Sequence, residues 1–141
     1  MLSKKTKYAL HALTYLAKKD ANEPTLILEI AENSRIPRKF LESILLDLKK
    51  QGILNSKMGK GGGYFLRQTP EQIRISTIIR LFNGPIALLP CVSLNYYQRC
   101  DECTDEKTCG LNKVFIDVRN ETLRILENKS IQDIVNQDPE L

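Results

Sequence analysis

A helix that runs directly into a glycine-rich, basic hairpin constrains the fold of this chain more than any other stretch. Residues 37–51 carry apolar side chains at three- and four-residue steps, and Gly52 follows where a glycine commonly ends a helix. Residues 53–57 and 63–67 then have the character of paired strands. The helix is expected to bury Phe40, Leu41, Ile44, Leu45 and Leu48.

The segment before this helix completes a helix-turn-helix. Residues 26–33 form a short helix, and Pro37 opens the next one at a position where its missing N–H costs nothing. Two helices joined by a short turn, with a basic hairpin behind them, are typical of a winged helix-turn-helix. A phosphate-binding P-loop is excluded, because Gly61 follows Lys60 where that motif requires Ser or Thr.

Two further helices flank this unit. Residues 3–19 show an apolar stripe behind Ser3, which is suited to cap a helix, and His11 lies on the opposite, polar face. Residues 75–83 form another helix, and the chain from 86 to 90 is apolar and expected to pack on the core. The predicted fold class is mainly α with a small β-hairpin: a winged helix-turn-helix with a long C-terminal helix.

The clearest periodicity lies in the C-terminal third. Apolar residues between 111 and 125 recur at alternating four- and three-residue steps, which is the spacing of a heptad seam. Because a cysteine-bearing loop separates this helix from the winged helix, we expect the seam to face a second copy of the chain. The predicted dimer interface consists of Leu111, Val114, Phe115, Val118, Thr122 and Ile125.

Charge is divided unevenly along the chain. Residues 1–67 hold 13 Lys and Arg against 6 Asp and Glu, whereas residues 68–141 hold 8 against 11. A basic winged helix joined to an acidic body favours a polyanionic partner, and we expect double-stranded DNA. A winged helix that binds another protein is the alternative. The apolar runs are too short for a membrane span, and the N-terminus lacks signal-peptide character, so a cytoplasmic protein is expected.

Residues at the start of the 37–51 helix are placed to meet DNA. The N-terminus of this helix directs N–H groups toward phosphate, and side chains one turn later are placed to reach base edges. The glycines of the hairpin allow close backbone approach, while its lysines supply charge. The predicted DNA-binding residues are Lys4, Lys7, Tyr8, Arg35, Arg38, Lys39, Glu42, Ser43, Lys57, Lys60, Gly61 and Gly62.

The cysteines of the chain are Cys91, Cys100, Cys103 and Cys109. In a reducing cytoplasm, such clustering favours metal or redox chemistry over structural disulfides. Four thiolates can hold a zinc ion or an iron–sulfur cluster, and the acidic residues between them favour a cation. A thiol–disulfide switch is a third possibility. A CxxC oxidoreductase would need a βαβ context that the chain lacks. Catalytic triads, carboxylate pairs and HExxH motifs are absent from the sequence, so an enzyme is not expected.

Several motifs together resemble one family of regulators. The chain is similar, from about residue 1 to 135, to the IscR- and NsrR-type winged-helix regulators of the Rrf family. The motifs that carry this resemblance are Leu2-Ser-x-Lys-x-x-Tyr8-Ala-Leu-x-Ala-Leu13, Glu29-Ile-Ala-Glu32, Ile36-Pro-x-x-Phe-Leu-Glu42-x-Ile-Leu45, Gly59-x-x-Gly-Gly63-Tyr-x-Leu66 and Gly84-Pro85.

This resemblance implies a homodimeric transcription factor whose long C-terminal helix dimerises and whose recognition helix enters the major groove. In several branches of the family, a cysteine loop before that helix binds an iron–sulfur cluster through three cysteines separated by five residues each. Cys103 and Cys109 match the second gap, whereas Cys100 is displaced toward Cys103, and Cys91 lies further upstream. One branch uses a histidine three residues after the last cysteine, where this chain has Asn112.

The sequence thus predicts four successive parts. Residues 1–85 form the winged helix-turn-helix head and residues 86–110 a cysteine-bearing sensor loop. Residues 111–135 form the dimerisation helix with a short closing helix, and residues 136–141 a frayed tail. Because the loop joins the head to the dimerisation helix, we expect a ligated loop to change how the two heads of a dimer meet a two-fold symmetric operator.

Overall fold

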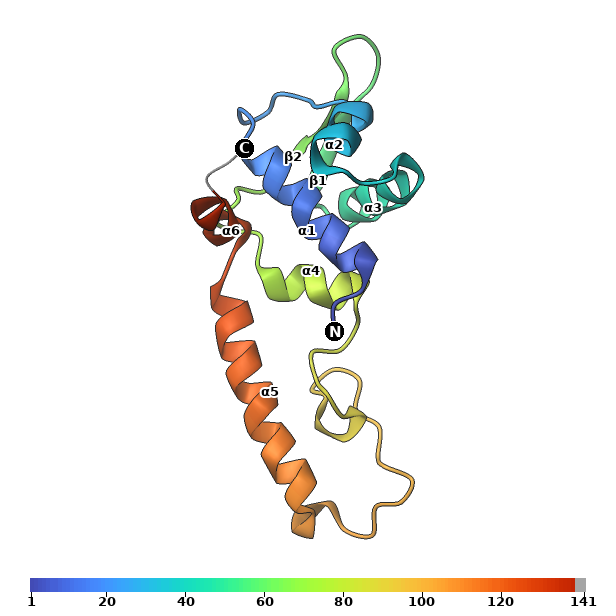
Figure 1. Ribbon diagram of the computed structural model, residues 1–141, viewed down its shortest axis with the longest axis vertical. Helices are drawn as coiled ribbons and strands as arrows, with labels where there is room; N and C mark the ends of the chain where they lie inside the picture. Colours follow the sequence, from blue (N-terminus) through green and yellow to red (C-terminus); the bar gives the residue numbers. More distant parts are fainter. Residues whose placement is uncertain (139–141) are drawn as a thin grey trace.

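One end of the molecule is a helical head, and a long helix extends away from it (Figure 1). The computed structural model describes residues 1–138. The head contains α1 (Lys4–Ala17), α2 (Ile27–Ser34), α3 (Arg38–Lys50), β1 (Leu54–Lys57), β2 (Gly63–Leu66), α4 (Ile75–Phe82) and α6 (Ile131–Gln137). The extended helix is α5 (Gly110–Asn128). The predicted mainly helical fold with a small hairpin is confirmed.

The core of the head forms where α1, α3 and α4 meet. Leu13, Leu41, Leu45 and Ile78 are fully buried there. Ser3 caps α1 as predicted, because its side chain accepts a hydrogen bond from the backbone N–H of Thr6. Full burial of a Leu or Ile side chain contributes about 1.5–3 kcal/mol, so these side chains account for much of the stability of the head.

The chain returns along α5 from the far end of the molecule, and α6 then completes this core. Ile131 is fully buried, and its N–H donates to the carbonyl of Ile73 at 3.0 Å. Lys18 of α1 forms an ion pair with Asp138 at 3.4 Å. The closing helix therefore packs in the head, and it continues through Gln137, within the segment expected to fray. Residues 139–141 of that expected tail lie outside the described chain.

The turn between α2 and α3 is tight. Arg35 has φ of 54°, a left-handed conformation that usually favours glycine and here ends α2. The N–H of Ile36 donates to the carbonyl of Ala31 at 3.0 Å, and the Ile36 side chain is buried. Pro37 is the N-cap of α3 rather than its first helical residue. The helix-turn-helix predicted from the sequence is thus present, with α3 as its second helix.

The hairpin, which we call the wing, is paired to the segment before α2 as well as to itself. Within it, Leu54 lies opposite Leu66 and Lys57 opposite Gly63. Thr25 and Tyr64 exchange two backbone hydrogen bonds of 2.8 Å, which ties the wing to the α1–α2 connection. The predicted strands are confirmed to within one residue at their ends.

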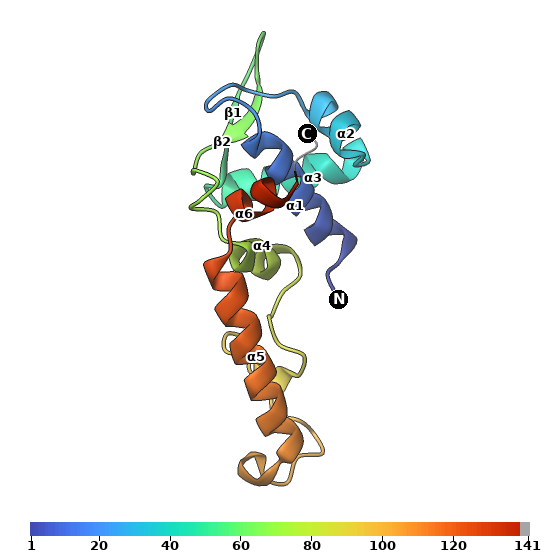
Figure 2. The same ribbon diagram turned by 60° about the vertical axis from the view of Figure 1, so that its left-hand side comes forward.

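The chain between α4 and α5 lies alongside α5 (Figure 2). It contains two short 3-10 turns, η1 (Pro90–Val92) and η2 (Glu106–Thr108). The prediction that residues 86–90 pack on the core was wrong, because Leu88 is 67% exposed and none of the five belongs to the buried cluster of the head. Across residues 1–138, no helix is both long and apolar enough to cross a membrane.

Candidate functional site

The exposed face of α3 carries the residues predicted to reach base edges. Arg38, Lys39, Glu42 and Ser43 are all exposed, whereas the opposite face of the helix is buried in the core. Arg38 Nε and Glu42 Oε1 form an exposed ion pair of 3.2 Å one turn apart. Such a pair is worth only about 0.3–0.5 kcal/mol, so both side chains are available to a new partner.

Helix α1 contributes a second group of predicted residues. Lys4 and Lys7 are exposed, and Tyr8 is half-buried against Phe40 of α3 with 6.3 Å between ring centroids. Phe40 was expected in the core, but it is 58% exposed. The surface beside the start of α3 is therefore partly aromatic, flanked by lysines.

The residues of the wing that were predicted to bind DNA fall into two groups, exposed and buried. Lys57, Lys60 and Gly61 are exposed, and Arg35 is exposed in the neighbouring turn. Gly62 is buried, and a Cβ on it would lie 2.2 Å from the carbonyl oxygen of Lys57. Its role is to close the hairpin turn, whereas the exposed residues are free to contact a ligand.

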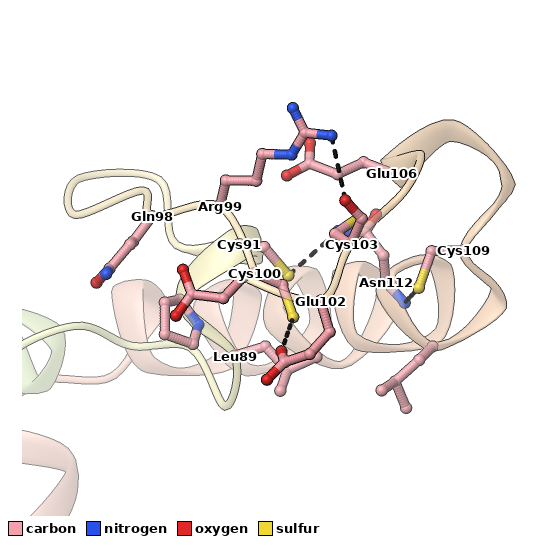
Figure 3. A pocket seen from close by; sticks show the side chains of 13 residues that line it. Leu89, Cys91, Gln98, Arg99, Cys100, Glu102, Cys103, Glu106, Cys109 and Asn112 are labelled. Carbon is pink, nitrogen blue, oxygen red and sulfur yellow. Dashed lines mark hydrogen bonds between the residues drawn. The ribbon is translucent and has the colours of Figure 1, made fainter.

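A separate pocket lies between the long loop and the N-terminal part of α5. All four cysteines border it, together with residues such as Arg99, Glu102 and Asn112, and its volume is about 400 Å³. Figure 3 shows that these side chains come from three segments: η1, the exposed loop after it, and the start of α5. We call this space the thiol pocket.

The inner side of the thiol pocket is built on α5. Cys109 is the N-cap residue of α5, and its Sγ accepts from the backbone N–H of Asn112 at 3.4 Å. The Asn112 side chain donates through Nδ2 to Cys91 Sγ, also at 3.4 Å, and Asn112 is only 7% exposed. Asn112 thus contacts both cysteines on this side.

The outer side is a loop that is held by hydrogen bonds between its own residues. Cys100 Sγ donates to Glu102 Oε2 at 3.1 Å, and this hydrogen bond raises the pKa of the Cys100 thiol. Arg99 donates to the carbonyl of Cys103 at 3.3 Å, and the N–H of Cys103 donates to the carbonyl of Cys100. The loop therefore presents two thiols on a short turn of their own.

The donor chemistry of the thiol pocket fits a metal or iron–sulfur cofactor, since four free thiols share one cavity with nearby carboxylates. Within residues 1–138, however, no three Cys, His, Asp or Glu side chains are gathered closely enough to hold a metal ion. Cys91 and Cys109 are held against α5, whereas Cys100 and Cys103 belong to the outer loop. Ligation by all four would therefore require that loop to close.

A row of apolar side chains on α5 is only partly covered by the rest of the described chain. Leu111, Val114, Val118 and Ile125 are 59, 57, 39 and 47% exposed. Phe115 and Thr122, the remaining members of the predicted seam, are partly buried. The opposite face of α5, which includes the buried Leu123, packs toward α4.

A sequence model described as "Iron-dependent Transcriptional regulator", that of Rrf2, matches residues 2–137. The chain belongs to the Rrf2 family of transcriptional regulators. The resemblance read from the helix and hairpin motifs is thereby confirmed, and so is the expectation of a regulator rather than an enzyme, because the relatives are regulators.

Rrf2 relatives match nearly the whole chain. An rrf2-like HTH-type regulator of Rhodobacter capsulatus is 43% identical over 138 residues, covering 96% of this chain and 92% of the relative. The regulator NsrR of Bacillus licheniformis is 31% identical over 138 residues, with 97 and 94% coverage. The structure of CymR (YrzC), the global cysteine regulator of B. subtilis, superposes with a TM-score of 0.79 at 26% identity over 97% of both chains. The predicted winged-helix fold is confirmed.

Two residues that support the thiol pocket of this Rrf2 protein were not found from the sequence. Asn112 was noted only for its position after Cys109, yet it contacts two cysteines. Arg119 of α5 donates to the carbonyl of Val92, next to Cys91, at 2.8 Å. An arginine on the polar side of an amphipathic helix carries no signal of such a contact, because its partner lies 27 positions away.

Proposed function

We propose that this Rrf2 protein is a cytoplasmic, homodimeric DNA-binding regulator whose affinity for a two-fold symmetric operator depends on the state of the thiol pocket. The observation that carries this proposal is the gathering of all four cysteines around one pocket at the start of α5. The surface suited to DNA lies in the head, at the other end of the molecule (Figure 1).

The proposed DNA surface combines α3, the wing and α1. Arg38, Lys39, Glu42 and Ser43 enter the major groove, where Arg can pair with guanine and a carboxylate can accept from cytosine N4. The other predicted residues bind the sugar-phosphate backbone or the minor groove and set the register of the head. They are Lys4, Lys7, Tyr8, Arg35, Lys57, Lys60 and Gly61. Gly62 supports this surface by shaping the wing.

The proposed dimer forms through the exposed row on α5. Its heptad spacing suits an identical helix, because a two-fold axis places the same residues opposite one another. Leu111, Val114, Val118 and Ile125 form the centre of this interface, with Phe115 and Thr122 beside them. Symmetry of the protein then requires symmetry of the operator, with one half-site for each head.

The proposed occupant of the thiol pocket is an iron–sulfur cluster held by Cys91, Cys100, Cys103 and Cys109. The description of the family model as iron-dependent and the supply of four thiolates support it. Such a cluster adds redox chemistry and cross-links the residues that hold it. A zinc ion with the same ligands, or a thiol–disulfide switch between them, is the alternative.

Coupling to DNA follows from where the cysteines are placed. Cys109 caps α5, so holding Cys100 and Cys103 against it would fix the outer loop to the dimerisation helix. The loop also begins directly after α4, which packs in the head. Restricting its freedom would change the spacing at which the two heads of a dimer are presented.

The experiment is a DNA-binding measurement on anaerobically purified protein. A duplex selected from a random library serves as the operator, and affinity is measured by fluorescence anisotropy for the loaded protein, the cofactor-stripped protein and Cys103→Ala. We expect the stripped protein and the variant to share one affinity, at least tenfold different from that of the loaded protein. Equal affinities for all three would contradict the proposed sensing, whereas absence of any selected duplex would contradict DNA recognition.

A further inference from the structure

The two sides of the thiol pocket differ in how they are held. On the inner side, η1 contacts α5, and Val92 is only 1% exposed beneath that contact. On the outer side, residues 99–108 form hydrogen bonds only with residues 97–109 in the described chain. One pair of cysteines is therefore attached to α5, and the other pair is attached only to its own loop.

Two side chains of α5 make the attachment of the inner side. Arg119 donates through Nη1 to the carbonyl of Val92 at 2.8 Å, directly after Cys91. Two turns earlier on the helix, Asn112 donates through Nδ2 to Cys91 Sγ at 3.4 Å. These contacts hold both the sulfur of Cys91 and the backbone beside it.

The Arg119 guanidinium is itself fixed. Asn120 Oδ1 accepts from its Nε at 3.1 Å and from its Nη2 at 2.8 Å, which leaves Nη1 directed at Val92. A fixed guanidinium loses less side-chain entropy when it forms a further bond, and a hydrogen bond from a charged donor is stronger than a neutral one. Arg119 is thus preorganised to hold η1.

We propose that Arg119 and Asn112 are positioning residues that dock the Cys91 turn onto α5, so that Cys91 and Cys109 form a fixed half of the thiol pocket and Cys100 and Cys103 form a half that closes onto it. This inference rests on the proposed function of the pocket and deepens it. It assigns Cys91, the cysteine furthest from the others in sequence, to the rigid part of the site. Closure of the pocket then moves the outer loop toward the dimerisation helix.

The test uses the reactivity of individual thiols in the metal-free protein under reducing, anaerobic conditions. Each cysteine is followed by mass spectrometry during alkylation with iodoacetamide, for the wild type, Arg119→Ala and Asn112→Leu. Losing the hydrogen bond from the charged Arg119 shifts the local opening equilibrium by about tenfold or more, so Arg119→Ala should alkylate Cys91 about ten times faster. Losing the bond from the neutral Asn112 amide shifts it less, so Asn112→Leu should alkylate Cys91 about two- to tenfold faster. Cys100 and Cys103 should react at unchanged rates.

Two further variants separate positioning from general effects. Arg124→Ala removes an exposed arginine of the same helix, whose partner is Glu121 at 2.7 Å, and should leave all four rates unchanged. Arg119→Lys keeps a cationic donor and should partly restore the slow rate of Cys91. An unchanged Cys91 rate in Arg119→Ala, or an equal rise at all four thiols, would overturn the proposal. Because the assay uses neither cofactor nor DNA, its result is independent of whether the proposed function holds.

Discussion

Gly63 of the wing provides the sharpest test of how the head is built, through the substitution Gly63→Ala. A Cβ at this position would lie 2.3 Å from the carbonyl oxygen of Thr25 and 2.9 Å from the backbone nitrogen of Leu26. Both atoms belong to backbone, so the clash cannot be relieved by rotating a side chain. The φ of 144° is also one that alanine rarely adopts.

The expected cost follows from these contacts. Separating the two segments breaks the pair of 2.8 Å hydrogen bonds between Thr25 and Tyr64, worth about 0.5–1.5 kcal/mol each. An unfavourable backbone conformation adds about 1–3 kcal/mol. The free energy of unfolding should therefore fall by about 2–6 kcal/mol for Gly63→Ala, a large part of the 5–15 kcal/mol typical of a domain.

The assay is urea unfolding followed by far-UV circular dichroism, with two matched glycines as controls. Gly59→Ala has a φ of 85° but no atom within 4 Å of the new Cβ, so it reports backbone strain without a clash. Gly110→Ala has neither, lies at the first residue of α5 and should be neutral or slightly stabilising. A Gly63→Ala protein as stable as Gly59→Ala would refute the reasoning, because the clash with Thr25 would then cost nothing.

Three further outcomes are expected. Arg38→Ala should weaken operator binding by about 1–3 kcal/mol, whereas Lys60→Ala should mainly lower the salt slope of binding by about one; identical isotherms across a salt series would contradict both roles. The hydrogen bond from the Ser130 backbone N–H lowers the pKa of Asp133 from 3.8. The stability that this capping carboxylate contributes to the folded state is therefore present above pH 3.8 and is lost as the pH falls through the lower folded pKa. Asp133→Asn should flatten this part of a plot of unfolding free energy against pH. Val118→Lys should convert the proposed dimer to a monomer in sedimentation velocity, because it places a charge in the proposed apolar seam; an unchanged dimer would exclude that seam as the interface.

The parts of the fold that could be predicted are those with a local signal. The local signals are the apolar spacing of the helices, Gly52 after α3 and the glycines of the wing. Each depends only on residues close together in the sequence, so the helix-turn-helix and the hairpin were predicted to within a few residues. Arg35 was not predicted in this way, because no local signal indicates a left-handed conformation at a non-glycine residue; the neighbouring Ile36 is buried in the core of the head.

Tertiary contacts account for what could not be predicted. The seven residues of α6 carry too short a pattern to indicate that Ile131 enters the core of the head. Phe40 follows the apolar spacing of α3 but lies at its edge, where Tyr8 covers only part of the ring. The hydrogen bond between Asn112 and Cys91 depends on how η1 packs on α5. The spacing of the cysteines along the loop does not indicate that packing.

The central claim is that the state of the thiol pocket sets DNA affinity, and one titration tests it most directly. Anaerobically purified protein is bound to its selected operator while the cofactor is removed stepwise, with visible absorption and fluorescence anisotropy recorded on the same sample. We predict a thiolate–iron absorption band whose loss runs parallel to a change in operator affinity of at least tenfold. An affinity that stays constant while the band disappears would contradict it.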